Sequence, residues 1–241
     1  MSDLVERAIA AHGGRAPYDA AREIAVEVRT GGAAFRSKRF GTVPPPLEMR
    51  CSTGEQRTVI SSCPRPGQRA VFTADEVRIE SAADGTVLKS RSDPRSRFPG
   101  GRRLLWWDHL DFTYFAGYAM WGYLNTPWVL ARPDVAAREV EPWSRDGETW
   151  RRLEVTFPPG LHVHCETQTF YFDATGRLRR NDYTAEPFGR LARAAHMCDD
   201  TREWDGLAFP ARRRVYPRRP DNRPAPFPTL VSLDVSRVEV G

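Results

Sequence analysis

The 23 residues from Trp106 to Trp128 contain nine of the chain's 26 aromatic side chains. Aromatic side chains carry large apolar areas and Tyr and Trp keep a polar group, so such a cluster builds either a core or a pocket for an apolar ligand. From Leu104 to Leu124 there is no proline and no strict alternation, which predicts a helix. One broad face of this helix carries Trp107, Leu110, Tyr114, Phe115, Tyr118 and Trp121. The rest of the chain must cover that face.

On both sides of the aromatic segment, apolar and polar residues alternate as in half-buried β-strands. The first flank begins with an expected helix over residues 3–11, which Ser2 caps and Gly13-Gly14 ends. The strands expected before the aromatic segment are 24–28, 35–43, 48–52, 57–61, 69–72, 77–80 and 86–89. The first two form a hairpin across Gly31-Gly32. The strands expected after it are 150–157, 162–172, 177–186, 196–205, 211–216 and 230–240.

Short strands at near-regular spacing indicate an antiparallel meander. Neither β region has enough apolar residues to close a core alone, so both are expected to belong to one sheet. We therefore predict a mainly β fold with helices, in a single domain over residues 1–241. Residues 104–128 form the helical aromatic insert of this domain.

The composition bears on the compartment of the protein. The first residues, MSDLVERAIAAHG, include acidic side chains and no apolar run like that of a signal peptide, and no later stretch is long enough for a membrane span. The four cysteines are widely spaced without a CxxC pair, which indicates reduced packing residues. We therefore expect a cytoplasmic protein with no membrane span.

A net charge of +5 and a pI of 9.3 raise the question of nucleic-acid binding. Arginines carry nearly all of the positive charge, and they alternate with Glu and Asp as on solvated sheet faces. The strongest basic patch is the run from Arg212 to Arg214, followed by Arg218 and Arg219. We interpret it as an exposed strand with a proline-broken end, because a dedicated binder clusters its charge on one element. No nucleic-acid partner is expected.

The order helix, glycine pair, β meander, helical insert and β meander occurs with an Ala11-His12-Gly13-Gly14 opening. A hairpin reads QTFYFD from Gln168 to Asp173 and continues with Gly176-Arg177-Leu178. With these features the chain resembles the LolA/LolB-like lipoprotein-carrier superfamily. The resemblance implies a strongly curved antiparallel sheet, an open half-barrel, with a helical plug on its concave face. It also implies an apolar cavity for acyl chains or similar ligands, and the aromatic segment is the expected plug.

The chain also departs from that family. Lipoprotein carriers of this superfamily are exported, whereas the first residues here show neither a signal peptide nor a lipid-attachment cysteine. We therefore expect a cytoplasmic, bacterial branch of the family that keeps the container but is not a periplasmic lipoprotein shuttle. Fold alone says little about the cargo.

The expected function is binding of an apolar small molecule or acyl-type ligand between the curved sheet and the aromatic helices. The candidate ligand-binding residues are Trp107, Tyr114, Phe115, Tyr118, Trp121 and Trp128. Two alternatives stay open: a cofactor-independent enzyme of cyclase or isomerase type in the same cavity, and a structural or interaction protein with a filled core. No GxSxG, Walker A, GxGxxG or HExxH motif is present, and no cofactor is expected.

Two clusters are candidates for chemistry. An expected strand places two histidines and a glutamate on one face, as in a zinc or iron site, with further ligands from a later strand. These candidate metal ligands are His162, His164, Glu166 and His196, with Cys198 and Asp199 beside the last. The simpler interpretation is a polar outer sheet face, and no metal is expected.

The candidate acid–base residues are His109 and Asp111, with Tyr118 as a possible donor to a ligand. Neighbouring residues on a helix do not face each other, so Asp108 cannot orient the ring of His109. The simpler interpretation is that Asp108 and Asp111 begin the helix and stabilise its N-terminal dipole.

Overall fold

The computed structural model describes residues 2–40, 46–98, 100–145 and 147–241. In these residues thirteen strands form one sheet, in the order β6-β5-β4-β3-β2-β1-β13-β12-β11-β10-β9-β8-β7, and every neighbouring pair is antiparallel. The first half contains β1 (Glu23–Gly31), β2 (Leu47–Ser52), β3 (Arg57–Ser61), β4 (Gln68–Thr73), β5 (Glu76–Ser81) and β6 (Val87–Ser92). The second half contains β7 (Ala136–Arg145), β8 (Glu148–Thr156), β9 (Thr167–Phe172), β10 (Leu178–Thr184), β11 (Arg193–Trp204), β12 (Leu207–Pro217) and β13 (Val231–Val240). The predicted single antiparallel sheet is confirmed.

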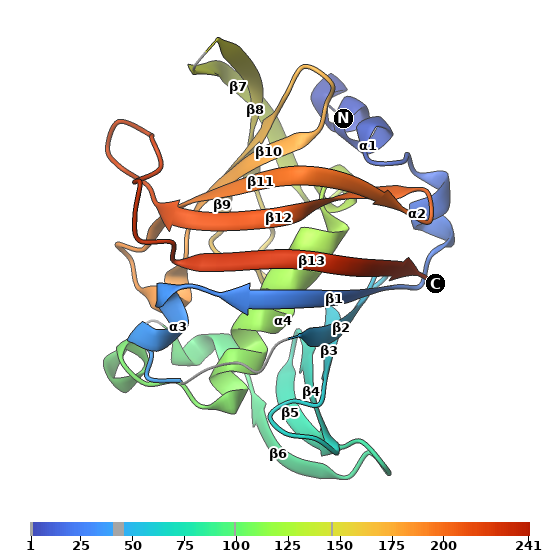
Figure 1. Ribbon diagram of the computed structural model, residues 1–241, viewed down its shortest axis with the longest axis vertical. Coiled ribbons are helices and arrows are strands. Elements are labelled where there is room, and N and C mark those ends of the chain that lie inside the picture. The colour runs from blue at the N-terminus through green and yellow to red at the C-terminus, as the bar shows by residue number, and fades with distance from the viewer. Residues whose placement is uncertain (1, 41–45, 99, 146) are drawn as a thin grey trace.

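Strands β1 and β13 join the two meanders. Ile24 lies opposite Val240 and Val26 opposite Val238, so strands from opposite ends of the chain meet in the middle of the sheet (Figure 1). A register shift between Glu27 and Val28 marks an irregularity of the kind that bends and twists a strand. Within the described part of the chain the edge strands β6 and β7 do not pair with each other, so the sheet stays open.

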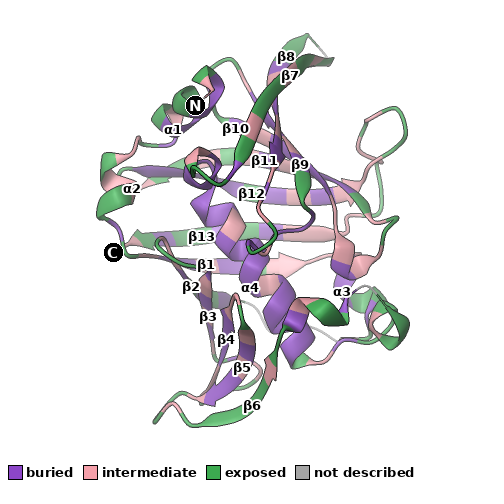
Figure 2. Ribbon diagram, turned by 180° about the vertical axis from the view of Figure 1, so that it is seen from behind, coloured by how far each residue is buried: buried purple, intermediate pink, exposed green. Residues whose placement is uncertain are grey.

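Helix α4 (His109–Asn125) crosses the concave side of the sheet, where most of its length is buried (Figures 1 and 2). The predicted helical plug is therefore present. It begins at His109 rather than Leu104, because Asp108 has the extended backbone of an N-cap and forms a capping box with Asp111. Residues Gly101–Leu104 form a 3-10 turn instead, η2.

The smaller helices lie at the ends of strands. They are α1 (Asp3–Ala11), α2 (Ala16–Ala20), α3 (Ala33–Ser37), η1 (Pro94–Arg97), η3 (Trp128–Ala131) and η4 (Glu186–Phe188). Helix α1 has the predicted bounds, and the Ser2 hydroxyl accepts a hydrogen bond from the Leu4 N–H. No helix in the described ranges is long and apolar enough to cross a membrane.

The predicted hairpin from β1 into residues 35–43 is wrong. After Gly32, whose φ of 109° ends the strand, the chain forms α3, and residues 41–45 lie outside the described residues. The reason is tertiary packing: the Phe35 ring lies 5.6 Å from the Phe112 ring and 5.9 Å from the Phe115 ring of α4. Strand β1 pairs with β2 and β13 instead.

Two further differences concern the second β region. Strand β9 begins at Thr167, so residues 162–166 of the predicted strand 162–172 belong to a loop. Strand β7 has no counterpart in the sequence prediction, because its sequence AAREVEPWSR contains three charged residues before a proline and lacks apolar alternation. Pro142 is tolerated there since β7 is an edge strand.

Helix α4 lies very close to the sheet at Gly117. A Cβ atom added there would lie 2.4 Å from Cβ of Phe72 on β4, and the Thr58 hydroxyl of β3 donates to the Gly117 carbonyl over 2.9 Å. At Gly122, further along α4, an added Cβ atom would have no neighbouring atom within 4 Å. The helix is thus fixed tightly to the β3–β4 region and has free space near its C-terminal end.

Gly117→Ala is expected to lower the free energy of unfolding by about 1–3 kcal/mol, because the new methyl group overpacks against Phe72. Gly122→Ala is the matched control, and it is expected to raise this free energy by about 0.5–1 kcal/mol through helix propensity alone. Urea denaturation followed by circular dichroism measures both. Equal effects of the two substitutions would contradict the close approach at Gly117.

Candidate functional site

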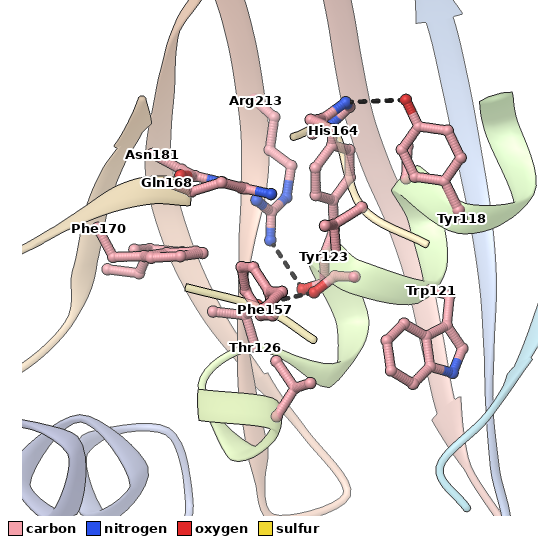
Figure 3. Close-up of a pocket in the computed structure, with 15 residues that line it drawn as sticks. Tyr118, Trp121, Tyr123, Thr126, Phe157, His164, Gln168, Phe170, Asn181 and Arg213 are labelled. Carbon is pink, nitrogen blue, oxygen red and sulfur yellow. Dashed lines mark hydrogen bonds between the residues drawn. The ribbon is translucent and has the colours of Figure 1, made fainter. Parts of the chain in front are cut away.

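A cavity lies between the C-terminal half of α4, the loop 157–166 and the inner face of β9–β12 (Figure 3). Its volume is about 30 Å³, room for roughly one or two water-sized groups. Its apolar wall consists of Tyr118, Ala119, Trp121, Gly122, Tyr123, Val129, Phe157, Val163, Phe170 and Leu178. Thr126 and His164 also contribute to the lining.

Beside this wall, a stripe of polar side chains crosses four adjacent strands. It consists of Gln168 on β9, Asn181 on β10, His196 on β11 and Arg213 on β12, and all four are buried. The amide nitrogen of Asn181 donates to the side-chain oxygen of Gln168 over 3.0 Å, and Asn181 lies opposite His196 in the strand register. Gln168, Asn181 and Arg213 line the cavity itself (Figure 3).

Arg213 is 4% exposed. Its guanidinium donates to Sγ of Cys198 over 3.3 Å and to the carbonyl of Tyr123 over 3.2 Å, and it lies 4.9 Å from the centre of the Tyr123 ring. Among the described residues no carboxylate forms an ion pair with it. The two hydrogen bonds engage two of its five N–H donors, and neither acceptor carries a charge.

His196 has no exposed surface, and within the described residues neither ring nitrogen has a hydrogen-bond partner. Its ring packs edge-on against Tyr123, 4.7 Å between centroids, and against Tyr183 at 6.1 Å. Burial, together with the charge of Arg213, holds the pKa of His196 well below its usual value, so the ring is neutral. The side-chain oxygen of Asn181 is likewise buried without a partner in the resolved ranges. Such groups are few in folded proteins, because a buried polar atom without a partner costs free energy.

His164, in contrast, has both ring nitrogens satisfied. Its Nδ1 lies 3.1 Å from the hydroxyl of Tyr118 and its Nε2 lies 2.9 Å from the hydroxyl of Tyr123, while its ring stacks on Tyr183 at 3.8 Å. Burial lowers the pKa of His164 to about 3, so a neutral ring accepts from one tyrosine and donates to the other. Burial also raises the pKa of Tyr123 to about 12, which keeps its hydroxyl protonated.

A second cavity, of about 40 Å³, lies on the other side of Ala119 and Tyr123, toward β1, β2 and β13. Its lining is almost entirely apolar: Thr30, Phe35, Leu47, Met49, Phe112, Phe115, Ala116, Ala119, Met120, Tyr123, Val231 and Leu233. Ala119 and Tyr123 line both cavities. The two voids are therefore neighbours along one face of α4.

No protein-family model matches the sequence, and no curated protein matches it significantly. Solved structures do match across nearly the whole chain. A LolA superfamily protein from Nitrosomonas europaea shares 12% identity over 99% of this chain and 92% of that chain, with a TM-score of 0.53. A DUF1329 family protein from Desulfovibrio piger shares 14% identity over 98% and 91% of the two chains, with a TM-score of 0.55. An outer membrane lipoprotein-sorting protein domain, so described, from Vibrio parahaemolyticus shares 10% over 99% and 91%, with a TM-score of 0.56.

The chain has a LolA-like fold. At sequence identities of 10–14% the similarity shows the fold alone and says nothing of the residues of the site.

In this LolA-like fold the six aromatic candidates occupy different places. Tyr118 and Trp121 line the first cavity and Phe115 lines the second. Trp128 stacks on Tyr18 at 4.4 Å beside a polar surface hollow. Trp107 and Tyr114 line none of these spaces: they pack on other aromatic rings, among them Phe98.

The acid–base candidates do not come together. His109 is exposed at the start of α4. Asp111 is buried in the capping box and forms ion pairs with Arg91 at 2.7 Å and Arg103 at 2.9 Å. Tyr118 is bound to His164 instead. Asp111 therefore has the structural role that the simpler interpretation gave it.

The candidate metal ligands do not share a strand face. His162 and His164 lie in the loop before β9, and His162 contacts the hydroxyl of Tyr114 through Nδ1 at 2.9 Å. Glu166 is exposed, while His196 is buried on β11. Across the described ranges no three His, Cys, Asp or Glu side chains are grouped to hold a metal ion. The predicted arrangement was wrong because residues 162–166 are not a strand.

Arg213, Asn181 and Gln168 were missed by the sequence interpretation. The basic run was read as an exposed strand, which holds for Arg212 but not for Arg213. A signal was present: Ala211 and Val215 flank Arg213 at a spacing of two, so strand alternation places it on the apolar face.

The buried His164 makes stability depend on pH. Its pKa is lowered from 6.5 to about 3 in the folded protein. Between these values the unfolded chain binds a proton that the folded chain does not, so stability is present above pH 6.5 and is lost as the pH falls.

Between pH 6.5 and about 3, the free energy of unfolding falls as the pH is lowered. Replacing His164 with Gln is expected to reduce the slope of this fall by up to about 1.4 kcal/mol per pH unit. Urea denaturation at a series of pH values measures the slope. His109→Gln, at an exposed position, serves as control: burial also lowers the pKa of His109, but less than that of His164, so this variant should flatten the slope less. An unchanged slope in His164→Gln would contradict a neutral, buried ring.

Proposed function

We propose that this protein binds a lipophilic ligand along the face of α4 that is turned toward β9–β13 and β1. The observation that carries the proposal is the pair of largely apolar voids that share Ala119 and Tyr123 in their linings. Their lining reaches from Phe112 to Thr126 along the helix, about 20 Å at 1.5 Å per residue. That length suits an extended acyl-type chain.

The voids are small in this structure, so binding requires α4 or its side chains to move. The helix is held on its other face by Gly117 against Phe72 and by the bond from Thr58. Room is therefore gained on the side of Ala119 and Tyr123, where the packing is loose. Each Å² of apolar ligand surface buried there contributes about 25 cal/mol.

One comparison supports the proposal: the chain shares its fold with a LolA superfamily protein and with a domain described as lipoprotein-sorting. We further propose a reducing, cytoplasmic compartment, because all four cysteines are free and buried.

The test uses an uncharged probe, N-phenyl-1-naphthylamine, whose fluorescence rises on burial, with hexadecanol as competitor. We expect saturable binding of the probe, displacement by hexadecanol and a change in the emission of Trp121, which lines the first cavity. Gly122→Leu fills the open space beside α4 and is expected to weaken binding about tenfold or more.

Gly160→Leu is the matched control, because Gly160 is exposed in a loop and also has nothing within 4 Å of an added Cβ. It should bind like the wild type. Absence of binding by the wild-type protein across a panel of neutral lipophiles would refute the proposal and favour the filled-core alternative.

A further inference from the structure

Arg213 differs from Arg180, the other arginine that is buried among the residues whose burial the structure describes. Arg180 is buried together with Asp182, and their ion pair measures 2.6 Å. Arg213 faces the cavity with only a thiol, a carbonyl and an aromatic ring as contacts in the described residues. Burying a charge without a counter-ion raises the free energy of the folded state, because the protein interior solvates the charge less well than water does.

The groups that surround Arg213 do not supply a negative charge. Burial raises the pKa of the Cys198 thiol to about 11 and that of the Tyr123 hydroxyl to about 12. His196 is neutral. Asp199 follows Cys198 on β11 and therefore points to the opposite face of the sheet, where it lies 3.7 Å from Arg179.

The charge of Arg213 lies at the edge of the first cavity. Arg213 lies at the polar side of a space whose remaining walls are aromatic and aliphatic, as Figure 3 shows. In the neighbouring stripe, the amide oxygen of Asn181 and both ring nitrogens of His196 are buried without a partner among the described residues. The site therefore offers an apolar wall for one part of a ligand and unsatisfied polar groups for another.

We propose that the ligand is a lipophilic carboxylic acid, whose carboxylate binds the guanidinium of Arg213 and whose apolar part lies along α4. This inference rests on the proposed lipophile-binding function and specifies its ligand class. The planar guanidinium matches a carboxylate in a bidentate pair. A carboxylate presents two oxygens, and the whole cavity that Arg213 lines, about 30 Å³, has room for roughly one or two groups of that size before α4 moves.

The experiment compares palmitate with hexadecanol, which have the same chain length and differ in the head group. Dissociation constants are measured by displacement of N-phenyl-1-naphthylamine at a pH of about 8, where the acid is ionised. The wild type is expected to prefer palmitate by about tenfold or more, because a charge-assisted hydrogen bond replaces an unpaired charge.

Arg213→Gln is expected to reduce this preference to about onefold while leaving the affinity for hexadecanol within about threefold. Arg213→Lys keeps the charge and should keep part of the preference. Arg212→Gln is the matched control, since Arg212 is adjacent on β12 but exposed on the opposite face, and it should retain the full preference.

Equal affinity of the wild type for palmitate and hexadecanol would overturn the inference, and this comparison does not depend on the folding of any variant. A preference that persists in Arg213→Gln would also overturn it. Tighter binding of hexadecyl phosphate than of palmitate would overturn the assignment of a carboxylate. Failure of the wild type to bind any of the three ligands would instead refute the proposed function itself.

Discussion

The whole structure depends on how one open sheet buries its concave face. The described residues form one sheet and no second sheet to pack on it, and the buried helix α4 covers its concave face. This explains why α4 is apolar nearly all round rather than amphipathic. The helix is also held asymmetrically, tightly at Gly117 on Phe72 and loosely at Ala119, and this asymmetry decides where space for a ligand exists.

The second feature of the site is a set of buried polar side chains that packing against α4 does not require. An entirely apolar inner face would cover α4 equally well, yet four strands contribute Gln168, Asn181, His196 and Arg213 in one stripe. Asp111, in contrast, is buried with counter-ions of its own, Arg91 and Arg103. Asp111 thus helps to hold the fold together, whereas Gln168, Asn181 and Arg213 line the cavity.

The sequence predicts those parts of the structure that depend on local signals. Helix α1 with its Ser2 cap and most strands follow from periodicity and turn residues. The hairpin after β1 failed because the burial of Phe35 on α4 overrides local preference, and β7 was missed because an edge strand needs no apolar alternation. The sequence predicts only part of the site. The density of aromatic residues indicates α4, but within the run from Arg212 to Arg214 the composition alone does not show that Arg213 points inward.

The pairing of β1 with β13 has a consequence for how the chain folds. Adjacent strands at the centre of the sheet come from the two ends of the sequence, which gives the native state contacts of very high sequence separation and predicts slow folding. During synthesis the amino-terminal meander is complete long before β13 emerges. Throughout that interval β1 presents a free edge with unpaired backbone groups, the kind of surface that recruits other chains. Pairing with β13 is thus the step that covers the free edge of β1.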